Sequence, residues 1–334
     1  MTGFAELSAA SNYSFLRGAS HPHEMVVQAM ALGMAGIGIA DRNTVAGVVR
    51  AHVALREATN KVVEDGLELP PFRLVVGARL VFADGTPEII AYPQDRSGWG
   101  WLTRLLSLGN RRTTKGDCEL YLDDLLAHGE GLLLIAFASE VDVPALRRLR
   151  EAFPRRLWLA TSMPRNGDDQ RRLERLRQLG RELCIPLIAT NDALYAVPED
   201  RPLHDVLTCI REKVTIHTAG RRLEANAERH LKSPAEMARL FHACPEAVAE
   251  SLNLLSRIRF SLDQLSYEYP HEPVPDGWEP LNWLKHLVMT AAYDRYGADL
   301  PPGVQVRLAE EFDLIERRNY ACYFLTVHDL VKFA

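Results

Sequence analysis

The residues with the most suggestive spacing for chemistry are His21 and His23, which form an H-x-H pair of the kind that many metal centres use. Their surroundings favour another role, because Pro22 follows a polar residue and Glu24 comes shortly after, as at the start of a capped helix. We therefore predict that His21-Pro22-His23 begins a helix, and metal binding by this pair stays as the alternative.

Other chemical signatures are missing from the sequence. It contains no G-x-S-x-G nucleophile motif and no G-x-x-x-x-G-K-[ST] phosphate loop, and GMAGIG (residues 33–38) precedes a predicted strand instead of following one. Among the Arg-rich stretches, RRTTKGD (residues 111–117) is the best candidate for phosphate contacts. The cysteines form no C-x-x-C pair and fit reduced thiols; they are Cys118, Cys184, Cys209, Cys244 and Cys322.

The pattern of apolar residues predicts repeated βα units up to about Thr190. Seven runs rich in β-branched residues are predicted strands: Phe4–Ala9, Ala35–Ala40, Phe72–Phe82, Glu88–Tyr92, Gly131–Phe137, Arg156–Ala160 and Pro186–Thr190. Between most of them lie predicted helices: Pro22–Leu32, Val45–Ala58, Trp99–Leu108, Pro144–Phe153 and Asp168–Leu183. Seven strands in a parallel sheet with helices outside favour a closed or nearly closed barrel.

Helical signals replace the strands after Pro198. The predicted helices are Arg201–Arg211, Ser233–Phe241, Pro245–Arg257, Leu281–Tyr296 and Val304–Arg317. The proline-rich segment SLDQLSYEYPHEPVPDGWEP interrupts them and marks a linker. We therefore predict one domain at 1–265, with a barrel core at about 1–200 and a helical extension at 201–265, and a second region at 266–334. The chain stops inside the apolar stretch VHDLVKFA, an end that looks like a cut.

In a βα barrel the functional groups follow the carboxyl ends of the strands, where the loops converge on one mouth. The expected mouth positions are Ser8, Ala10, Ser11, Asn12, Asp41, Arg42, Asn43, Arg79, Tyr92, Asp95, Ser139, Glu140, Thr161, Asn191, Asp192 and Leu194. They include no histidine and no cysteine, which leaves too few ligands for a di- or trinuclear metal site. Beyond these positions, His204 is the one histidine expected near the mouth.

Arg42 and Arg79 would place two permanent positive charges where metal cations ought to sit, at a cost on the order of several kcal/mol in a low-dielectric interior. We hypothesise that they pair with Asp41 or Asp192, which gives a metal-free mouth held by ion pairs. The alternative is that either arginine points outward as a solvated surface charge.

Composition sets the class of the protein. The chain has 334 residues, of which 47% are apolar and 25% charged, as in globular proteins with two structural units. Its formal net charge of −5 argues against a protein that coats nucleic acid over its whole surface, although a local basic patch is compatible with it. No signal peptide and no long apolar run are present, so we expect a cytoplasmic protein that does not contact a membrane.

Several segments, among them FAELSAASNYSFLRGASHPHEMVVQA, IADRNTVAGVVRAH, VVGARLVFADG and HDVLTCIRE, resemble the N-terminal domain of bacterial C-family DNA polymerases. That domain belongs to the polymerase and histidinol phosphatase (PHP) family. ADRNTVAGVVRAH and YEYPHEPVP are closer to the error-prone, translesion paralogues than to the replicative polymerase III α subunit. The resemblance implies an α/β fold, a PHP-type distorted (β/α)7 barrel followed by a mainly helical region that leads into the polymerase palm.

The resemblance also implies where metal ligands would stand. The H-x-H of metal-binding members corresponds to Ser8 and Ala10, the ligand His after the second strand to Arg42, and the ligand Glu after the third strand to Arg79.

The late Asp-x-His of those members corresponds to Asp192 and Leu194, so Asp192 is the only ligand retained among these positions. The resemblance therefore implies a degenerate site that holds no metal and has no exonuclease or phosphatase activity.

The last stretch, LAEEFDLIERRNYACYFLTVHDLVKFA, resembles the start of the polymerase palm. The full-length enzyme would be a DNA-directed DNA polymerase, a nucleotidyltransferase for translesion synthesis after DNA damage, with Mg²⁺ held by aspartates beyond residue 334. This segment alone is expected to be inactive. DNA, the sliding clamp and accessory mutagenesis proteins are the partners that the resemblance implies.

Two other functions stay open. One is a metal-dependent phosphoesterase or proofreading 3′–5′ exonuclease with an altered ligand set that includes His21 and His23. The other is a stand-alone interaction module that competes with the full polymerase for its partners.

Overall fold

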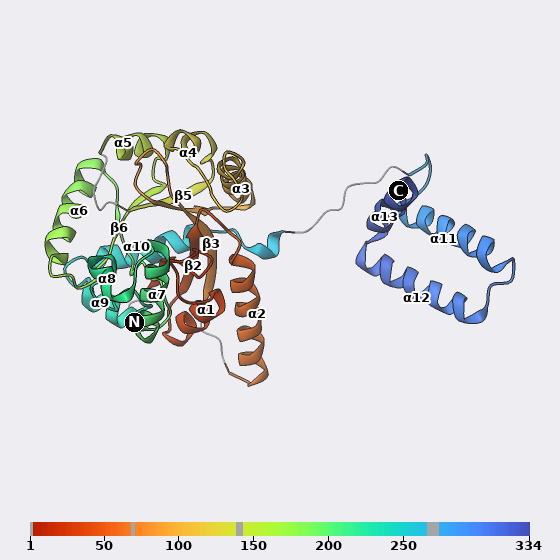
Figure 1. Ribbon diagram of the computed structural model, residues 1–334, viewed down its shortest axis with the longest axis horizontal. Coiled ribbons are helices and arrows are strands. Elements are labelled where there is room, and N and C mark those ends of the chain that lie inside the picture. Colours follow the sequence, from red (N-terminus) through yellow and green to blue (C-terminus); the bar gives the residue numbers. More distant parts are fainter. Residues whose placement is uncertain (1–2, 68–70, 138–142, 266–273) are drawn as a thin grey trace. The chain divides into compact units, whose positions relative to one another are not determined.

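The computed structural model describes residues 3–67, 71–137, 143–265 and 274–334 of the chain. The chain forms two compact units, Met1–Leu265 and Ser266–Ala334, which are described separately below (Figure 1). The proline-rich segment predicted as a linker lies partly outside the described residues, which do not include 266–273.

The first unit is built on one seven-stranded sheet whose strands are neighbours in chain order. The strands are β1 (Ala5–Ala9), β2 (Gly36–Arg42), β3 (Arg73–Leu80), β4 (Ile89–Pro93), β5 (Leu132–Phe137), β6 (Leu157–Thr161) and β7 (Leu187–Ala189). Both faces are covered, because nearly every strand residue is buried, and strands of this kind read as continuous apolar runs. The predicted mixed α/β class with seven strands is confirmed.

Strand β4 breaks the predicted parallel arrangement. It runs antiparallel to both β3 and β5, whereas every other neighbouring pair is parallel. The physical reason is the short connection 81–88, since a parallel crossover needs a dozen residues or more and a hairpin needs only a few. The carboxyl end of β4 therefore lies at the opposite end of the sheet from the mouth, and residue 88 at its start lies at the mouth.

This reversal removes two residues from the expected mouth. Tyr92 is fully buried and its hydroxyl donates a hydrogen bond to the Leu7 carbonyl oxygen at 2.8 Å. Asp95 caps the next helix, where its carboxylate accepts from the Gly98 N–H at 3.0 Å. Both predictions were wrong because periodicity reveals a strand without revealing its direction.

Helices surround the sheet (Figure 1). They are α1 (Pro22–Ala31), α2 (Val48–Glu64), α3 (Arg96–Arg111), α4 (Leu122–His128), α5 (Val143–Ala152), α6 (Asp169–Leu183), α7 (Arg201–Glu212), α8 (Ile216–Ala219), α9 (Pro234–Leu240) and α10 (Pro245–Arg257). Short 3₁₀ turns at Pro198–Asp200, Gly220–Arg222 and Leu262–Gln264 complete the unit. The short helices α4 and α8 were not predicted, because they hold too few turns for a periodic signal.

The two edge strands, β1 and β7, are joined by side chains. The buried carboxylate of Glu6 on β1 accepts hydrogen bonds from the Thr190 hydroxyl at 2.5 Å and the Asn191 N–H at 2.7 Å, just past β7. Helix α10 covers the same seam, where the Ser251 hydroxyl accepts from the Ala5 N–H at 3.2 Å. Burial raises the pKa of Glu6 above its usual value, and the hydrogen bonds oppose that rise. The buried Glu6 carboxylate therefore links the two edge strands of the sheet.

The second unit consists of three helices, α11 (Pro280–Tyr296), α12 (Pro302–Arg318) and α13 (Ala321–Phe333). Pro280 and Pro302 occupy the first helical positions, where a missing N–H costs nothing. A small apolar cluster that includes Leu284, Ile315 and Leu325 lies between the helices. Among the described residues, no helix combines the length and the apolar character that crossing a membrane requires.

Candidate functional site

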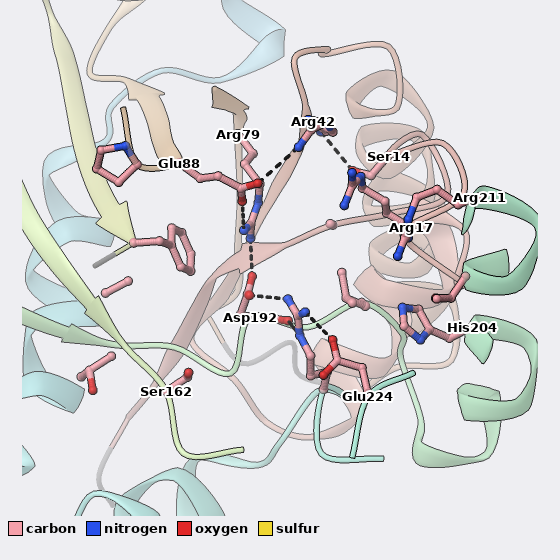
Figure 2. Close-up of a pocket in the computed structure, with 18 of the residues that line it drawn as sticks. Ser14, Arg17, Arg42, Arg79, Glu88, Ser162, Asp192, His204, Arg211 and Glu224 are labelled. Atoms are coloured by element: carbon pink, nitrogen blue, oxygen red, sulfur yellow. Dashed lines mark hydrogen bonds and ion pairs between the residues drawn. The ribbon is translucent and has the colours of Figure 1, made fainter. Parts of the chain in front are cut away.

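A cavity of about 580 Å³ opens at the carboxyl ends of β1, β2, β3 and β6, and we call it the mouth cavity (Figure 2). The first strands bring Ala10, Arg42 and Arg79 to its wall, and the reversed β4 brings Glu88. The turn after β7 adds Asp192. The fold therefore gathers residues that are far apart in the sequence around one polar space.

Arg79 stands at the centre of this space. Its guanidinium forms ion pairs with Glu88, at 3.0 Å, and with Asp192, and it donates a hydrogen bond to the Ser8 carbonyl oxygen at 3.3 Å. The Phe137 ring lies 4.4 Å from the guanidinium carbon, measured to the ring centre, as a cation–π contact. These contacts direct Arg79 into the mouth, where a solvated outward orientation had been the alternative.

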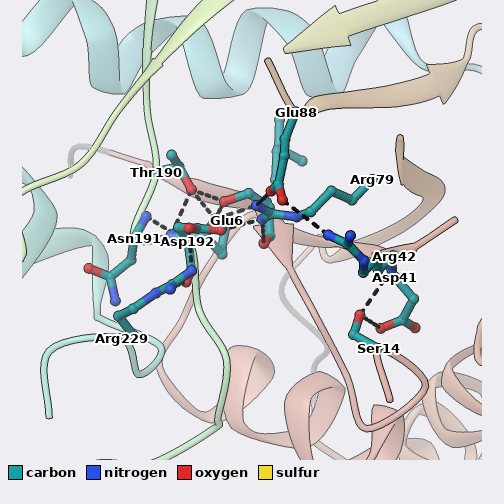
Figure 3. Close-up of polar contacts among 12 residues, drawn as sticks. Glu6, Ser14, Asp41, Arg42, Arg79, Glu88, Thr190, Asn191, Asp192 and Arg229 are labelled. Carbon is teal, nitrogen blue, oxygen red and sulfur yellow. Dashed lines mark hydrogen bonds and ion pairs between the residues drawn. The ribbon is translucent and has the colours of Figure 1, made fainter. Parts of the chain in front are cut away.

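The ion pairs continue on both sides of Arg79 (Figure 3). Arg42 pairs with Glu88 at 3.2 Å, on one side. On the other side Arg229 pairs with Asp192 and, at 2.9 Å, with Glu224. The result is a row of alternating charges across the mouth, in which Asp192 is held between two guanidinium groups.

The charges keep one another ionised. Burial alone would raise the pKa of the Asp192 carboxyl, but Arg229 and Arg79 outweigh burial and hold that pKa below its usual value. Burial alone would lower the pKa of Arg79, and Asp192 and Glu88 reverse that effect. Both partners are therefore charged at neutral pH, and the Asp192 oxygens are engaged by arginines.

Asp41 does not join these ion pairs, contrary to one of the predicted pairings. Its carboxylate accepts hydrogen bonds from the Ser11 N–H at 2.7 Å, from the Ser11 hydroxyl at 2.8 Å and from the Ser14 hydroxyl at 2.7 Å. The residue is 1% exposed, and burial raises the pKa of its carboxyl. Asp41 faces the loop after β1, because three donors of that loop satisfy it, and it anchors residues 11–18.

The remaining positions that correspond to family ligands carry no strong metal donor. Ser8 is buried and its hydroxyl donates to the Glu6 carboxylate at 2.8 Å. Ala10 and Leu194 belong to one buried apolar cluster with Tyr195. Within the described ranges, no group of three or more His, Cys, Asp or Glu side chains has the geometry of a metal centre. The described side chains at this mouth therefore offer fewer metal donors than the ligand set that the resemblance implies.

The histidines take other places. His21 precedes Pro22 at the start of α1, and its N–H donates to the Glu24 carboxylate at 2.7 Å, which confirms the predicted helix start. The rings of His21 and His23 stack at 5.4 Å, and neither residue lines the mouth cavity. His204 does line it, and burial lowers the pKa of its imidazole.

Two other expected mouth positions serve the loops around the cavity. The Asn43 side chain accepts from the Val81 N–H at 2.8 Å, and the Asn191 amide donates to the Glu228 carbonyl oxygen at 2.8 Å. Ser139 and Glu140 lie outside the described residues.

Several residues of the site were not found in the sequence. Glu88 was missed because periodicity locates β4 without giving its direction. Arg229 and Glu224 come from the irregular segment between α8 and α9, where no periodicity predicts a side chain's direction. Arg17 and Arg211 also line the mouth cavity, and only their residue type could have drawn attention to them.

Comparison with known proteins adds the family context. Residues 6–172 match the model of the PHP domain, and residues 282–334 match that of the bacterial DNA polymerase III alpha NTPase domain. The chain is 48% identical to the error-prone DNA polymerase of Rhodopseudomonas palustris (strain BisB5) over 336 residues, and 47% identical to that of Brucella abortus over 340 residues. These alignments cover 99% and 100% of this chain, but 30% and 31% of the relatives.

Among solved structures, a putative metal-dependent phosphoesterase from Bifidobacterium adolescentis is similar with a TM-score of 0.40 and 15% identity. The alignment covers 57% of this chain and 88% of the other.

Proposed function

Because the chain belongs to the PHP domain family, we propose that it is the N-terminal portion of an error-prone DNA polymerase, in which the barrel mouth holds no metal and serves as a structural platform. The chain spans about 30% of the length of the curated relatives it matches. The activity of the whole protein therefore belongs to this proposal.

One observation carries the metal-free part of the proposal. Asp192, the single retained ligand position, has its carboxylate held by Arg79 and Arg229. A divalent cation at this point would have to displace two guanidinium groups and would meet the positive charge of both at close range. The ion pairs instead tie β3 to the turn after β7, which suits a rigid support better than a hydrolytic centre.

The polymerase part rests on the relatives. The full-length protein would transfer a deoxynucleoside monophosphate from its triphosphate to a primer 3′-hydroxyl, with Mg²⁺ held by aspartates that follow residue 334. DNA, the sliding clamp and accessory mutagenesis proteins are the proposed partners, and the cytoplasm is the proposed location. The role proposed for the whole protein is translesion synthesis after DNA damage.

Two measurements test the proposal. The full-length protein with Mg²⁺ should extend a primer across a damaged template base, and the 334-residue chain should not. The 334-residue chain should hydrolyse neither 3′-labelled DNA nor a phosphate monoester in Mn²⁺ or Zn²⁺. Stoichiometric metal in the purified chain, with nuclease activity that Asp192→Ala abolishes, would instead establish the metal-dependent phosphoesterase.

A further inference from the structure

The mouth cavity carries more positive charge than its ion pairs use. Seven arginines and three carboxylates line it, an excess of four positive charges in a chain whose formal net charge is −5. Arg42, Arg79 and Arg229 already share all three carboxylates. Of the other four arginines, Arg172 pairs with Asp169 at 3.4 Å and Arg211 pairs with Glu212 at 3.0 Å, both carboxylates lying outside the cavity lining. Arg17 and Arg222 form no ion pair among the described residues.

Arg17 is the clearest case. Its side chain is half-buried, and among the described residues its guanidinium forms neither a hydrogen bond nor an ion pair. The loop that carries it is held firmly, because Asp41 binds Ser11 and Ser14, and the Arg17 N–H donates to the Ser14 carbonyl oxygen at 2.8 Å. Gly18 fixes the return of this loop, since a Cβ there would lie 2.0 Å from the Ser11 carbonyl oxygen. An unpaired cation is thus presented from a rigid segment.

Two further arginines lie beside Arg17 (Figure 2). Burial lowers the pKa of Arg17, the nearby charges of Arg42 and Arg211 lower it further, and the carboxylates of Glu88 and Glu212 offset part of this effect. Arg211, on α7, donates to the Leu16 carbonyl oxygen at 2.7 Å, which brings its guanidinium to the same loop. Glu88 and Glu212 compensate part of the repulsion among the three guanidinium groups, and an anion bound beside the unpaired Arg17 would compensate more of it.

These three arginines also line a second cavity of about 1050 Å³, which we call the side cavity. It extends to residues 113–116 and includes Lys115, within the stretch singled out in the sequence for phosphate contacts. Phe15 lines it as well, and 80% of that residue is exposed. Asp117 and Glu119 also line the side cavity, against Arg17, Arg42, Lys115 and Arg211, so positive charges still outnumber negative ones there. The two cavities share three arginines and therefore form one net positive path, with the exposed Phe15 ring beside it.

The floor of the mouth cavity offers unused polar atoms. The hydroxyl oxygens of Thr161 and Thr208 and the Nδ1 atom of His204 are buried and have no hydrogen-bond partner among the described residues. Buried polar atoms are normally satisfied, so these atoms are suited to bind a polar ligand that enters the cavity.

We propose that this path binds single-stranded nucleic acid, with backbone phosphates on Arg17, Arg42 and Arg211 and one base stacked on Phe15. A positive groove with an exposed aromatic ring is how proteins hold single strands without reading their sequence. A duplex is disfavoured, because a paired base has no free face to offer Phe15. The inference goes beyond the proposed function, which gives the mouth a structural role only.

The test uses the 334-residue chain and a fluorescein-labelled oligothymidylate of about 16 nucleotides, a length that covers typical single-strand sites. Fluorescence anisotropy at several salt concentrations gives both the affinity and its salt dependence. We expect tighter binding of the single strand than of a duplex of the same length. We also expect Arg17→Gln to weaken binding and to reduce the slope of log affinity against log salt by about 0.7, the value of one phosphate contact on a single strand.

Matched variants distinguish the contributions of base stacking and of the Arg17 charge to binding from the effect of changing the net charge of the chain. Phe15→Ala and Phe15→Leu should each weaken binding about tenfold, because leucine fills space without a flat ring. Arg147→Gln, an equal charge change at an exposed position on α5 outside both cavities, should leave affinity and slope unchanged. Arg17→Gln breaks no side-chain contact, so thermal unfolding should match that of the parent chain.

The inference is overturned if the chain does not bind the oligonucleotide, if duplex binds as well as single strand, or if Arg17→Gln behaves like Arg147→Gln. It is also overturned if inorganic phosphate binds the path and the strand does not. The assay contains no nucleotide triphosphate or metal, so its failure would leave the primer-extension result of the full-length protein unaffected.

Discussion

Arg79 on β3 and Asp192 in the turn after β7 form a largely buried ion pair across the mouth of the barrel, and Arg229 binds the same carboxylate through its other oxygen. Asp192 has a left-handed backbone with φ of 50°, in which its N–H donates to the Thr190 hydroxyl at 2.9 Å. Asp tolerates this conformation better than most residues. The left-handed turn at Asp192 therefore places its carboxylate between Arg79 and Arg229.

Removing the carboxylate should destabilise the first unit strongly. Asp192→Ala leaves Arg79 and Arg229 facing each other without a counter-charge, and breaking a buried pair in this way costs about 3–5 kcal/mol. Chemical denaturation followed by circular dichroism measures the free energy of unfolding. The control is Asp123→Ala, which breaks the exposed pair between Asp123 and Arg148 and should cost about 1 kcal/mol or less. Equal losses in the two variants would contradict a buried, coupled pair.

The Asp192 carboxylate should make the stability of the folded chain depend on pH. Since the pKa of Asp192 is lower in the folded chain than its ordinary value of 3.8, the pair contributes its full stability above that value. This contribution is lost as the pH falls through the lowered pKa. Melting temperatures of the parent chain and Asp192→Asn should therefore converge below pH 3.8. A constant difference between them down to strong acid would show that the charge of Asp192 is not involved.

The contribution of Glu6 to stability should depend on pH in the opposite direction. Its pKa is raised by burial, so the folded chain binds that proton more tightly than the unfolded chain does. Relative to Glu6→Gln, the parent chain should gain stability as the pH falls through the raised pKa of Glu6. At neutral pH Glu6→Gln should still cost about 1–3 kcal/mol, because the amide NH₂ cannot accept from the donors around it. Differential scanning calorimetry from neutral to acidic pH distinguishes the two residues by the sign of the change.

Two glycine substitutions should change stability in opposite directions. Gly18→Ala puts a Cβ against the Ser11 carbonyl oxygen, which forces the loop to shift at a cost of about 1–3 kcal/mol. A methyl group on Gly100, inside α3, would meet no described atom outside its own helix backbone within 4 Å, so Gly100→Ala should stabilise by about 0.5–1 kcal/mol. Thermal unfolding measures the melting temperature of both variants against that of the parent chain. An unchanged melting temperature for Gly18→Ala would show that the loop is not held against Ser11.

The strands were predictable because their β-branched and apolar runs stand out between helical segments. The apolar pattern of a strand is the same in either direction, so it could not show that β4 runs antiparallel to its neighbours. For the same reason Glu88 was not predicted at the mouth. The length of the connection 81–88 held the missing information. The apolar face of α13 is visible in the sequence, but one short apolar stretch does not by itself distinguish a helix from other structure.

The site was only partly predictable, for a different reason. Arg79 and Asp192 follow strands and could be placed by topology. Arg229 comes from an irregular segment, and its contact with Asp192 follows from tertiary packing that no local pattern encodes. Asp41 also follows a strand, but the donors of the loop after β1 were invisible in the sequence, so its partners were predicted wrongly.

The way in which the edge strands β1 and β7 are joined determines what sets their relative register. A continuous ladder would lock the two strands in one register, and a slip by one residue would turn every side chain of a strand to the other face. Here Glu6 and α10 join the strands through side chains. Beyond the strand ends, the Ala10 N–H donates a backbone hydrogen bond to the Ala193 carbonyl oxygen at 2.9 Å. The register of β1 relative to β7 therefore depends on the Glu6 side chain and on α10, and not on a backbone ladder.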